Sequence, residues 1–205
     1  MGMSKSNARK IVVKCAKLYK DNLCNKKMLF VYEINSKIKY VNVSCYPSNY
    51  KHLTGIDTVC SARDFFELCC NQKISEDTLV LKRNGTTELK LKVLEQIMDI
   101  AHQVRFIGDY LNSNIYLELD KIVGNISCGL GIENNEGNSY YPKSVLNGDI
   151  RKQIVNMHPI IAVFEKLLWE PNYKIVKMNG NLTEKKKQTI YTFVDSDDNA
   201  TTEHI

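Results

Sequence analysis

The sequence is poor in proline, histidine and tryptophan, and it has no long apolar run. Its 205 residues include 4 prolines, 4 histidines and 1 tryptophan. The first ten residues are polar, and no apolar stretch approaches the ~20 residues that a membrane-spanning helix needs. We therefore expect no signal peptide, no contact with a membrane and a cytoplasmic protein.

Several signatures of cofactor and metal sites are also missing. The chain has no Walker loop, no dinucleotide-binding glycine fingerprint, no HExxH pair and no GxSxG elbow. Two glycines occur in "GLGIEN", but a third glycine and a following helix are lacking, so a strand bend or bulge explains them better. Neither a cofactor nor a metal ion is expected.

The cysteines do not form a recognisable framework. Their spacing includes no CxxC and no Cys/His ligand pattern, and one pair is adjacent, which is poor geometry for a disulfide. The seven positions are 15, 24, 45, 60, 69, 70 and 128. We expect reduced cysteines that serve as small core residues.

The remaining composition is that of a globular chain with an uneven charge. Hydrophobic residues make up 43% and charged residues 25%, and the net charge is +5. Residues 1–27 hold eight basic side chains against Asp21 alone, whereas residues 195–205 hold acidic side chains and no Lys or Arg. These patterns predict a basic N-terminal helix within 1–27, a single domain over 28–194 and an acidic disordered tail over 195–205.

Periodicity predicts an α+β fold in which N-terminal helices and a hairpin precede an antiparallel β-meander. Helical spacing covers residues 6–23, 61–71 and 88–103. Strand patterns cover residues 27–34, 37–45, 115–124, 126–132, 139–146, 160–168, 173–178 and 189–194. We expect residues 115–180 to form the meander, with Leu94, Met98 and Ala101 packed against it.

The first candidate site is the stretch "NYKHLTGI", residues 49–56. It places His52 in an expected loop, with Lys51 before it and Thr54 and Gly55 after it. An imidazole with a pKa near ~6.5 can give or take a proton at neutral pH, and a nearby hydroxyl can orient a phosphate. The alternative is that both side chains only bond the backbone of the turn. His158, before Pro159, is expected in another loop that could reach a site.

The second candidate region is "YYPKSVLNGDIRKQI", residues 140–154. It supplies an aromatic ring at Tyr141, a cation at Lys143 and a hydroxyl at Ser144. Arg151 could form a fork to a phosphate or to Asp149, and both alternatives stay open.

A basic stripe marks the expected N-terminal helix. Lys10, Lys14 and Lys17 fall on one helical face, away from the apolar side chains. Such a stripe can bind RNA or an acidic protein, and it can equally be a solvated helix face.

Several motifs together resemble one family of proteins. In chain order they are "HLTGI", "SARDFFELC", "KIS", "IGDY", "DKIVGN", "GLGI", "YYPKSVLNGDIR" and "IIAVFEK". They resemble a phage-associated family of the nuclease superfamily that groups barnase, EndoU, the tRNA-cutting colicins and RelE, over roughly residues 28–180. The resemblance implies helices followed by an antiparallel sheet, which agrees with the periodicity.

The resemblance also implies an activity. Known members cleave RNA without a metal, by attack of the ribose 2′-OH on the adjacent phosphate. His52 would then act as acid or base, Thr54 would bond a phosphate oxygen, and Lys143 and Arg151 would stabilise the developing charge. Tyr141 would stack a base. Lys51, Ser144, Lys10, Lys14 and Lys17 complete the candidate RNA-binding set.

The phage context implies a toxin or an anti-host factor in the cytoplasm of a bacterial host. RNA is the expected partner, and a host protein or an antitoxin is a second expected partner. The alternative is a non-catalytic phage protein that inhibits a host factor such as a defence complex. The sequence does not indicate the oligomeric state.

Overall fold

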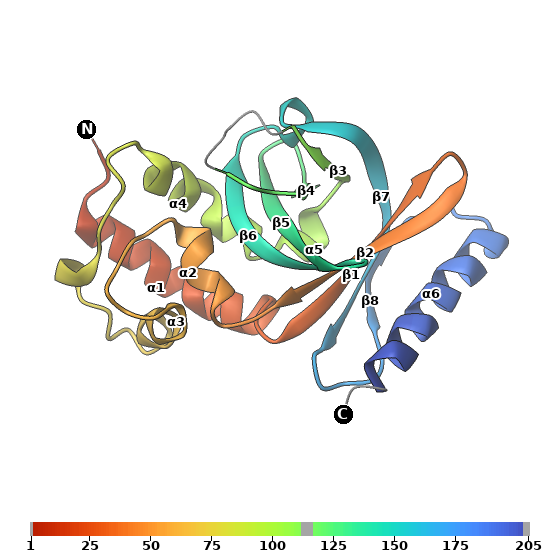
Figure 1. Cartoon of the computed structure of the whole chain (residues 1–205), viewed down its shortest axis with the longest axis horizontal. Helices are drawn as coiled ribbons and strands as arrows, with labels where there is room; N and C mark the ends of the chain where they lie inside the picture. Colours follow the sequence, from red (N-terminus) through yellow and green to blue (C-terminus); the bar gives the residue numbers. More distant parts are fainter. Residues whose placement is uncertain (1, 112–116, 203–205) are drawn as a thin grey trace.

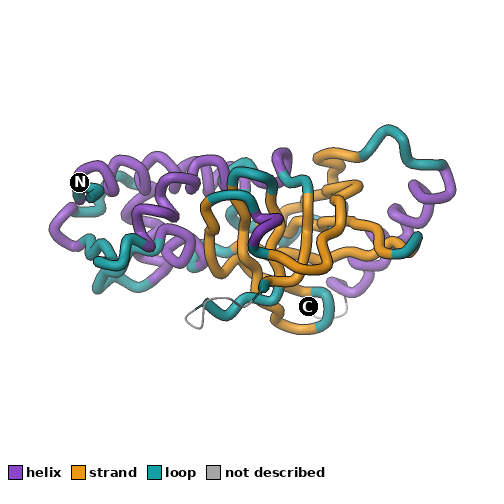
Figure 2. Tube along the Cα trace, turned by 90° about the horizontal axis from the view of Figure 1, so that it is seen from above, coloured by secondary structure: helices purple, strands orange, loops and turns teal. Residues whose placement is uncertain are grey.

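The computed structural model describes residues 2–111 and 117–202. A cluster of helices forms one end of the molecule, a β-barrel forms the middle, and the C-terminal helix packs at the other end (Figure 1). Viewed from above, the same three parts follow one another along the long axis (Figure 2). The site described below lies where the helical end meets the barrel.

Short-range signals in the sequence account for most helix boundaries. Ser4 and Ser61 cap their helices, because their hydroxyl oxygens accept the backbone N–H of Asn7 and Asp64. The helices are α1 (Lys5–Asn22), α2 (Asn49–Thr54), α3 (Ala62–Cys70), α4 (Thr86–Ile97), α5 (Ile100–Gln103) and α6 (Glu184–Thr202). Short 3₁₀ turns are η1 (Glu76–Thr78) and η2 (Ile150–Lys152).

The described residues contain a single eight-stranded sheet that closes on itself. Its strands are β1 (Lys26–Ile34), β2 (Lys37–Cys45), β3 (Phe106–Tyr110), β4 (Lys121–Gly124), β5 (Cys128–Glu136), β6 (Ser139–Asn147), β7 (Ile154–Leu167) and β8 (Lys174–Met178). The order is β1-β2-β6-β5-β4-β3-β7-β8, and an additional β1–β7 pairing closes seven strands into a barrel. Strand β8 extends β7 outside the ring.

The α+β class is confirmed, but a simple antiparallel meander is wrong. The N-terminal hairpin joins the same sheet, since β2 pairs in parallel with β6 and β1 pairs with β7. The hairpin itself turns at Asn35 and Ser36, as expected, and both have positive φ. Residues 115 and 116 of the expected strand 115–124 lie outside the described residues, and β4 begins only at Lys121.

Three further elements differ from expectation. Residues 189–194, expected as a strand, lie within α6, which continues to Thr202 through most of the segment expected to be a disordered tail. The helix expected over 88–103 divides into α4 and α5 at Met98 and Asp99. His158 lies on β7 rather than in a loop.

The main core fills the barrel and continues beneath the helices. Leu94, Met98 and Ala101 are buried in it, and α4 packs on β5 and β6 as expected. A second cluster lies under α6 and includes Leu29 and Ile190. All seven cysteines are unbridged, and five of them are buried in the core as the sequence predicts, while Cys60 and Cys70 are half-buried against it. Among the described helices, none has both the length and the apolar character required to cross a membrane.

Candidate functional site

A cleft of about 440 Å³ lies between α2, α4 and β6. Its walls bring together two regions that sequence analysis singled out separately, the stretch around His52 and the strand that carries Lys143. The side chains that dominate its chemistry are His52, Lys82, Lys90, Glu118, Lys143 and Ser144. One histidine therefore faces an excess of cations.

His52 lies on a short helix and not on the loop that was expected. Helix α2 ends at Gly55, whose φ of +66° belongs to the left-handed region that favours glycine. A Cβ at this position would lie 2.9 Å from Cδ of Lys90, so the absence of a side chain lets Lys90 lie across the end of the helix. Gly55 thus sets the contact between α2 and α4.

Two neighbours of His52 have structural contacts. The Thr54 hydroxyl, which is fully buried, donates to the Lys51 carbonyl oxygen at 2.8 Å and accepts the Ile56 N–H at 3.1 Å. The Lys51 ammonium donates to the carbonyl oxygens of Thr58 and Cys60 at 3.1 and 2.9 Å. Thr54 does not line the cleft, and Lys51 contributes to its wall while bracing the loop that follows α2.

The cleft favours the neutral form of His52. The residue is exposed at the mouth of the cleft, yet partial burial of the ring lowers its pKa below the ordinary value. The nearby cations of Lys143, Lys90 and Lys51 lower this pKa further, because they repel an imidazolium. A neutral imidazole at neutral pH is suited to accept a proton.

Lys90 is the most perturbed cation in the cleft. Its ammonium donates to the carbonyl oxygen of His52 at 2.9 Å. Burial, assisted by the charge of Lys82, lowers the pKa of Lys90 to about 8. A lysine with this pKa is still mostly protonated at pH 7, but it gives up its proton more readily than an ordinary lysine.

Lys143 enters the cleft from β6 and is held by a carboxylate. Its ammonium lies 2.6 Å from Oε2 of Glu133, which also accepts a 2.5 Å hydrogen bond from the Tyr141 hydroxyl. The hydrogen bond to Glu133 raises the pKa of Lys143, so this cation stays charged. Tyr141 lies beside Lys143 and outside the cleft lining.

Ser144 lines the cleft and carries a buried, unsatisfied hydroxyl. The residue is 0% exposed, and its hydroxyl oxygen is the only buried side-chain N or O atom among the described residues that has no hydrogen-bond partner. A buried hydroxyl without a partner costs free energy, roughly 1–3 kcal/mol. Such a cost in a folded protein points to a ligand that supplies the missing partner.

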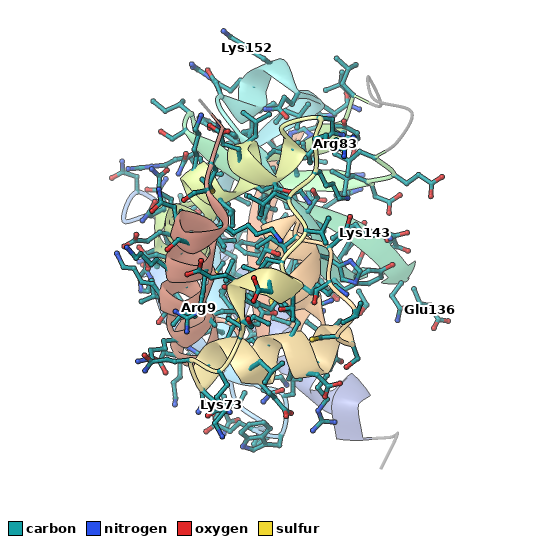
Figure 3. The ribbon with its side chains drawn as sticks, turned by 90° about the vertical axis from the view of Figure 1, so that its left-hand side faces the viewer. Arg9, Lys73, Arg83, Glu136, Lys143 and Lys152 are labelled. Atoms are coloured by element: carbon teal, nitrogen blue, oxygen red, sulfur yellow. The ribbon has the colours of Figure 1, made fainter. Side chains whose placement is uncertain are left out.

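The other candidate residues lie elsewhere. Arg151 on η2 forms a fork to Asp149, with contacts of 2.7–3.0 Å, which is one of the two alternatives that the sequence leaves open. Lys10, Lys14 and Lys17 lie on α1, where Lys14 pairs with Glu95 at 2.6 Å. In Figure 3, Lys143 lies away from both Arg9 of α1 and Lys152 of η2. Arg151 and the three α1 lysines do not line the cleft.

Sequence analysis missed Lys82 and Lys90. The signal for Lys90 was present, since Thr87, Lys90 and Leu94 recur at spacings of three and four and therefore share the inward face of α4. A lysine on such a face has a desolvated ammonium. Lys82 lies in the loop before α4, and no sequence pattern distinguishes it.

The described part of the chain contains no group of three or more His, Cys, Asp or Glu side chains arranged to hold a metal ion. Within the cleft, the lysines would instead be the groups that meet an anionic ligand. The anion that most plainly suits several lysines and an unpaired hydroxyl is a phosphate.

Comparison with known proteins identifies the family. A family model described as "phage-Barnase-EndoU-ColicinE5/D-RelE like nuclease4" matches residues 11–181. No curated protein and no solved structure matches the chain at a significant level. The match includes α2, α4 and β6, and so the whole of the cleft. The chain belongs to this family of phage nucleases.

Proposed function

We propose that the chain is a metal-independent endoribonuclease, and that the cleft between α2, α4 and β6 is its active site. The 2′-oxygen of a ribose attacks the adjacent phosphorus while the bond to the 5′-oxygen breaks. The products are a 2′,3′-cyclic phosphate and a 5′-hydroxyl. This reaction needs a proton acceptor, a proton donor and positive charge around the phosphate.

The cleft residues suit these three tasks. Neutral His52 takes the proton from the 2′-OH, a role favoured by its lowered pKa. Lys90, with a pKa of about 8, gives a proton to the departing 5′-oxygen. Lys82 and Lys143 stabilise the charge on the phosphate oxygens, which supplies electrostatic stabilisation without a metal ion.

One observation carries the proposal most strongly. The Ser144 hydroxyl is buried at the edge of a lysine-rich cleft and has no hydrogen-bond partner in the described chain. A phosphate oxygen would accept its proton, and the cost of the unsatisfied hydroxyl would then be removed on binding. A hydroxyl needed only for folding would be expected to have a partner within the protein.

The test is cleavage of a defined single-stranded RNA with analysis of both new ends. We expect a cyclic phosphate and a 5′-hydroxyl, and no cleavage where the attacking 2′-OH is replaced by hydrogen. His52→Ala should lower kcat/KM by about 10²–10⁴-fold, the usual effect of removing a general acid or base. EDTA should leave the rate unchanged.

The matched control is His102→Ala, because His102 lies on the surface outside the cleft and pairs with Asp99. It should cleave at the parent rate. Cleavage of DNA as fast as RNA, or activity that EDTA abolishes and a divalent ion restores, would contradict the proposed mechanism. A folded protein that cuts no RNA would favour a non-catalytic phage protein that binds a host factor.

A further inference from the structure

A second cleft, of about 430 Å³, opens on the barrel. It is lined by residues of β1, β3, β4 and β7 and shares no lining residue with the first cleft. It reaches the tip of the β1–β2 hairpin, which Figure 1 shows on the side of the barrel away from α2 and α4. The proposed nuclease mechanism uses none of its residues.

One wall of this second cleft is aromatic. The rings of Tyr32 and His158 are stacked, with centroids 5.8 Å apart and an interplanar angle of 27°. Tyr32 is 6% exposed overall and lines the cleft. Its hydroxyl oxygen is not among the described buried atoms that lack a partner, so it reaches the open side of the cleft, where a ligand can bond it.

The polar groups of the second cleft converge on Asp109. Its Oδ1 pairs with the Lys121 ammonium, and its Oδ2 accepts a 2.9 Å hydrogen bond from the side-chain amide of Asn156. Asn156 belongs to an irregularity of β7, where the pairing with β3 shifts register. Such irregularities commonly re-aim a side chain toward a site.

Asp109 and Lys121 are both charged at neutral pH. Burial alone would raise the pKa of Asp109, but the hydrogen bonds from Lys121 and Asn156 lower it below its ordinary value. Burial would likewise lower the pKa of Lys121, but the carboxylate raises it. The carboxylate retains unused lone pairs and the ammonium retains unused N–H groups, so an acceptor and a donor lie side by side at the cleft.

We propose that the second cleft binds a nucleobase with a lactam edge, in which an N–H group adjoins a carbonyl, as in guanine and uracil. The base N–H donates to Asp109, the base carbonyl accepts from Lys121, and the planar ring packs against the Tyr32–His158 wall. The Tyr32 hydroxyl at the cleft supplies one more hydrogen bond.

The charges argue against other small ligands. A free phosphate would have to approach Asp109, whose negative charge already compensates Lys121. Adenine and cytosine place an unprotonated ring nitrogen beside an amino group, so they would present a lone pair where the lactam edge presents its N–H. Selectivity should therefore separate guanine and uracil from adenine and cytosine.

Titration calorimetry of the full chain with GMP, UMP, AMP and CMP tests this proposal. GMP and UMP should bind at least tenfold more tightly than AMP and CMP, since each well-matched pair of base contacts discriminates by about that factor or more. Equal affinity for all four, or no binding of GMP and UMP at millimolar concentration, would overturn the proposal. The readout is binding, so this outcome is independent of whether the chain cleaves RNA.

Variants locate the ligand. Asp109→Asn should weaken GMP binding by at least tenfold and reduce the preference over AMP, and Tyr32→Phe should weaken it severalfold while keeping the ring. The matched control is His102→Ala, at a surface position outside both clefts, which should bind GMP as the parent does. Ser144→Ala reports on the first cleft. Loss of GMP binding in Ser144→Ala and not in Asp109→Asn would assign the nucleotide to the first cleft and refute the proposal.

Thermal denaturation checks that each variant is folded. If Asp109→Asn does not fold, Tyr32→Phe remains informative, because it removes only a hydroxyl.

A last comparison separates the two sources of the base, a bound RNA and a free nucleotide. An uncleavable 2′-O-methyl oligonucleotide with one guanine among adenines is titrated beside GMP. Tighter binding of the oligonucleotide identifies the base of a bound RNA, and tighter binding of GMP identifies a free nucleotide.

Discussion

Ser144 and Thr54 are two fully buried hydroxyls near one cleft, and their surroundings differ. Thr54 both donates and accepts a hydrogen bond at the end of α2, whereas Ser144 has no partner within the described chain. The first arrangement is typical of a group that stabilises the fold. The second is typical of a group whose partner arrives with a ligand.

Substitution by alanine should therefore have opposite effects at the two positions. Ser144→Ala should be as stable as the parent or more stable, because it removes a buried unsatisfied hydroxyl, and it should cleave RNA roughly 10- to 100-fold more slowly through the loss of one charge-assisted hydrogen bond. Thr54→Ala should lose about 1–3 kcal/mol of unfolding free energy. Urea denaturation and initial rates measure both. A Ser144→Ala variant that loses stability and keeps its rate would refute this interpretation.

The pH dependence of cleavage follows from the two perturbed groups. His52 must be neutral to accept a proton, and its pKa is below the ordinary ~6.5, so kcat/KM should fall only at pH values below that. Lys90 must be protonated, and its pKa is about 8, so the rate should fall again above about pH 8. A rate profile from pH 4 to 10 should be bell-shaped.

Lys90→Arg isolates the alkaline limb. A guanidinium keeps its proton throughout this range, so the decline near pH 8 should disappear or move to much higher pH, even if the maximum rate is lower. The acidic limb should remain where it is, since His52 is unchanged. An alkaline limb that persists near pH 8 in this variant would exclude Lys90 as the titrating group.

Sequence reasoning at the residue scale found part of the cleft. It singled out Lys51, His52, Lys143 and Ser144, and the structure brings these four into one cleft. It did not find Lys90, and the other groups that it favoured, Thr54 and Arg151, have partners within the protein. The difference has a physical reason: a motif shows which chemical groups are available, but only the fold shows which of them meet in one cleft.

At the scale of elements, the junction of α2 and α4 depends on a glycine. Gly55 and Gly85 both have left-handed φ, of +66° and +79°. A Cβ at Gly55 would meet Lys90, while a Cβ at Gly85 would have no neighbour within 4 Å. The two positions therefore separate backbone strain from displacement of a side chain.

Alanine at either glycine should cost about 1–2 kcal/mol of unfolding free energy, the cost of a left-handed conformation for a residue with a Cβ. Only Gly55→Ala should also reduce the cleavage rate and shift the alkaline limb, because Lys90 must move. Gly85→Ala is the control and should keep the parent profile. Equal loss of rate in both variants would mean that Gly55 does not position Lys90.

Local signals predicted some elements well and others poorly. The hairpin and α3 carry turn and cap residues, so their boundaries follow from the sequence. Residues 189–194 read as a strand because they combine β-branched and aromatic residues, but Ile190 and Val194 lie one helical turn apart and bury the same face of α6 against the barrel. Tertiary packing outweighs local propensity there.

At the scale of the whole molecule, barrel closure could not be read from the sequence. Strand β1 pairs with β7, so that Lys26 lies opposite Leu167, more than a hundred residues away along the chain. The apolar pattern of both strands indicates that each lies inside a sheet between two other strands. Many strand orders satisfy the same pattern. The parallel pairing of β2 with β6 is of the same kind.

The whole molecule also decides which lysines line the first cleft. The stripe of Lys10, Lys14 and Lys17 on α1 does not line the first cleft, and Lys14 is paired with Glu95. Lys82, Lys90 and Lys143 do line it. If the cleft holds the scissile phosphate, the counterions displaced by RNA are mainly those near the second set, although the stripe carries the same number of charges.

Salt dependence of RNA affinity distinguishes the two sets. Each phosphate neutralised on a single strand contributes about 0.7 to the slope of log K against log salt, so replacing all three cleft lysines by alanine should flatten the slope by roughly two. A second variant, in which alanine replaces Lys10, Lys14 and Lys17, removes the same net charge. It should change the slope by less than about half a unit. Fluorescence anisotropy with an uncleavable 2′-O-methyl RNA at several salt concentrations gives both values. If the α1 variant flattened the slope more than the cleft variant, the RNA would lie along α1. The cleft would then bind the scissile phosphate alone or no phosphate.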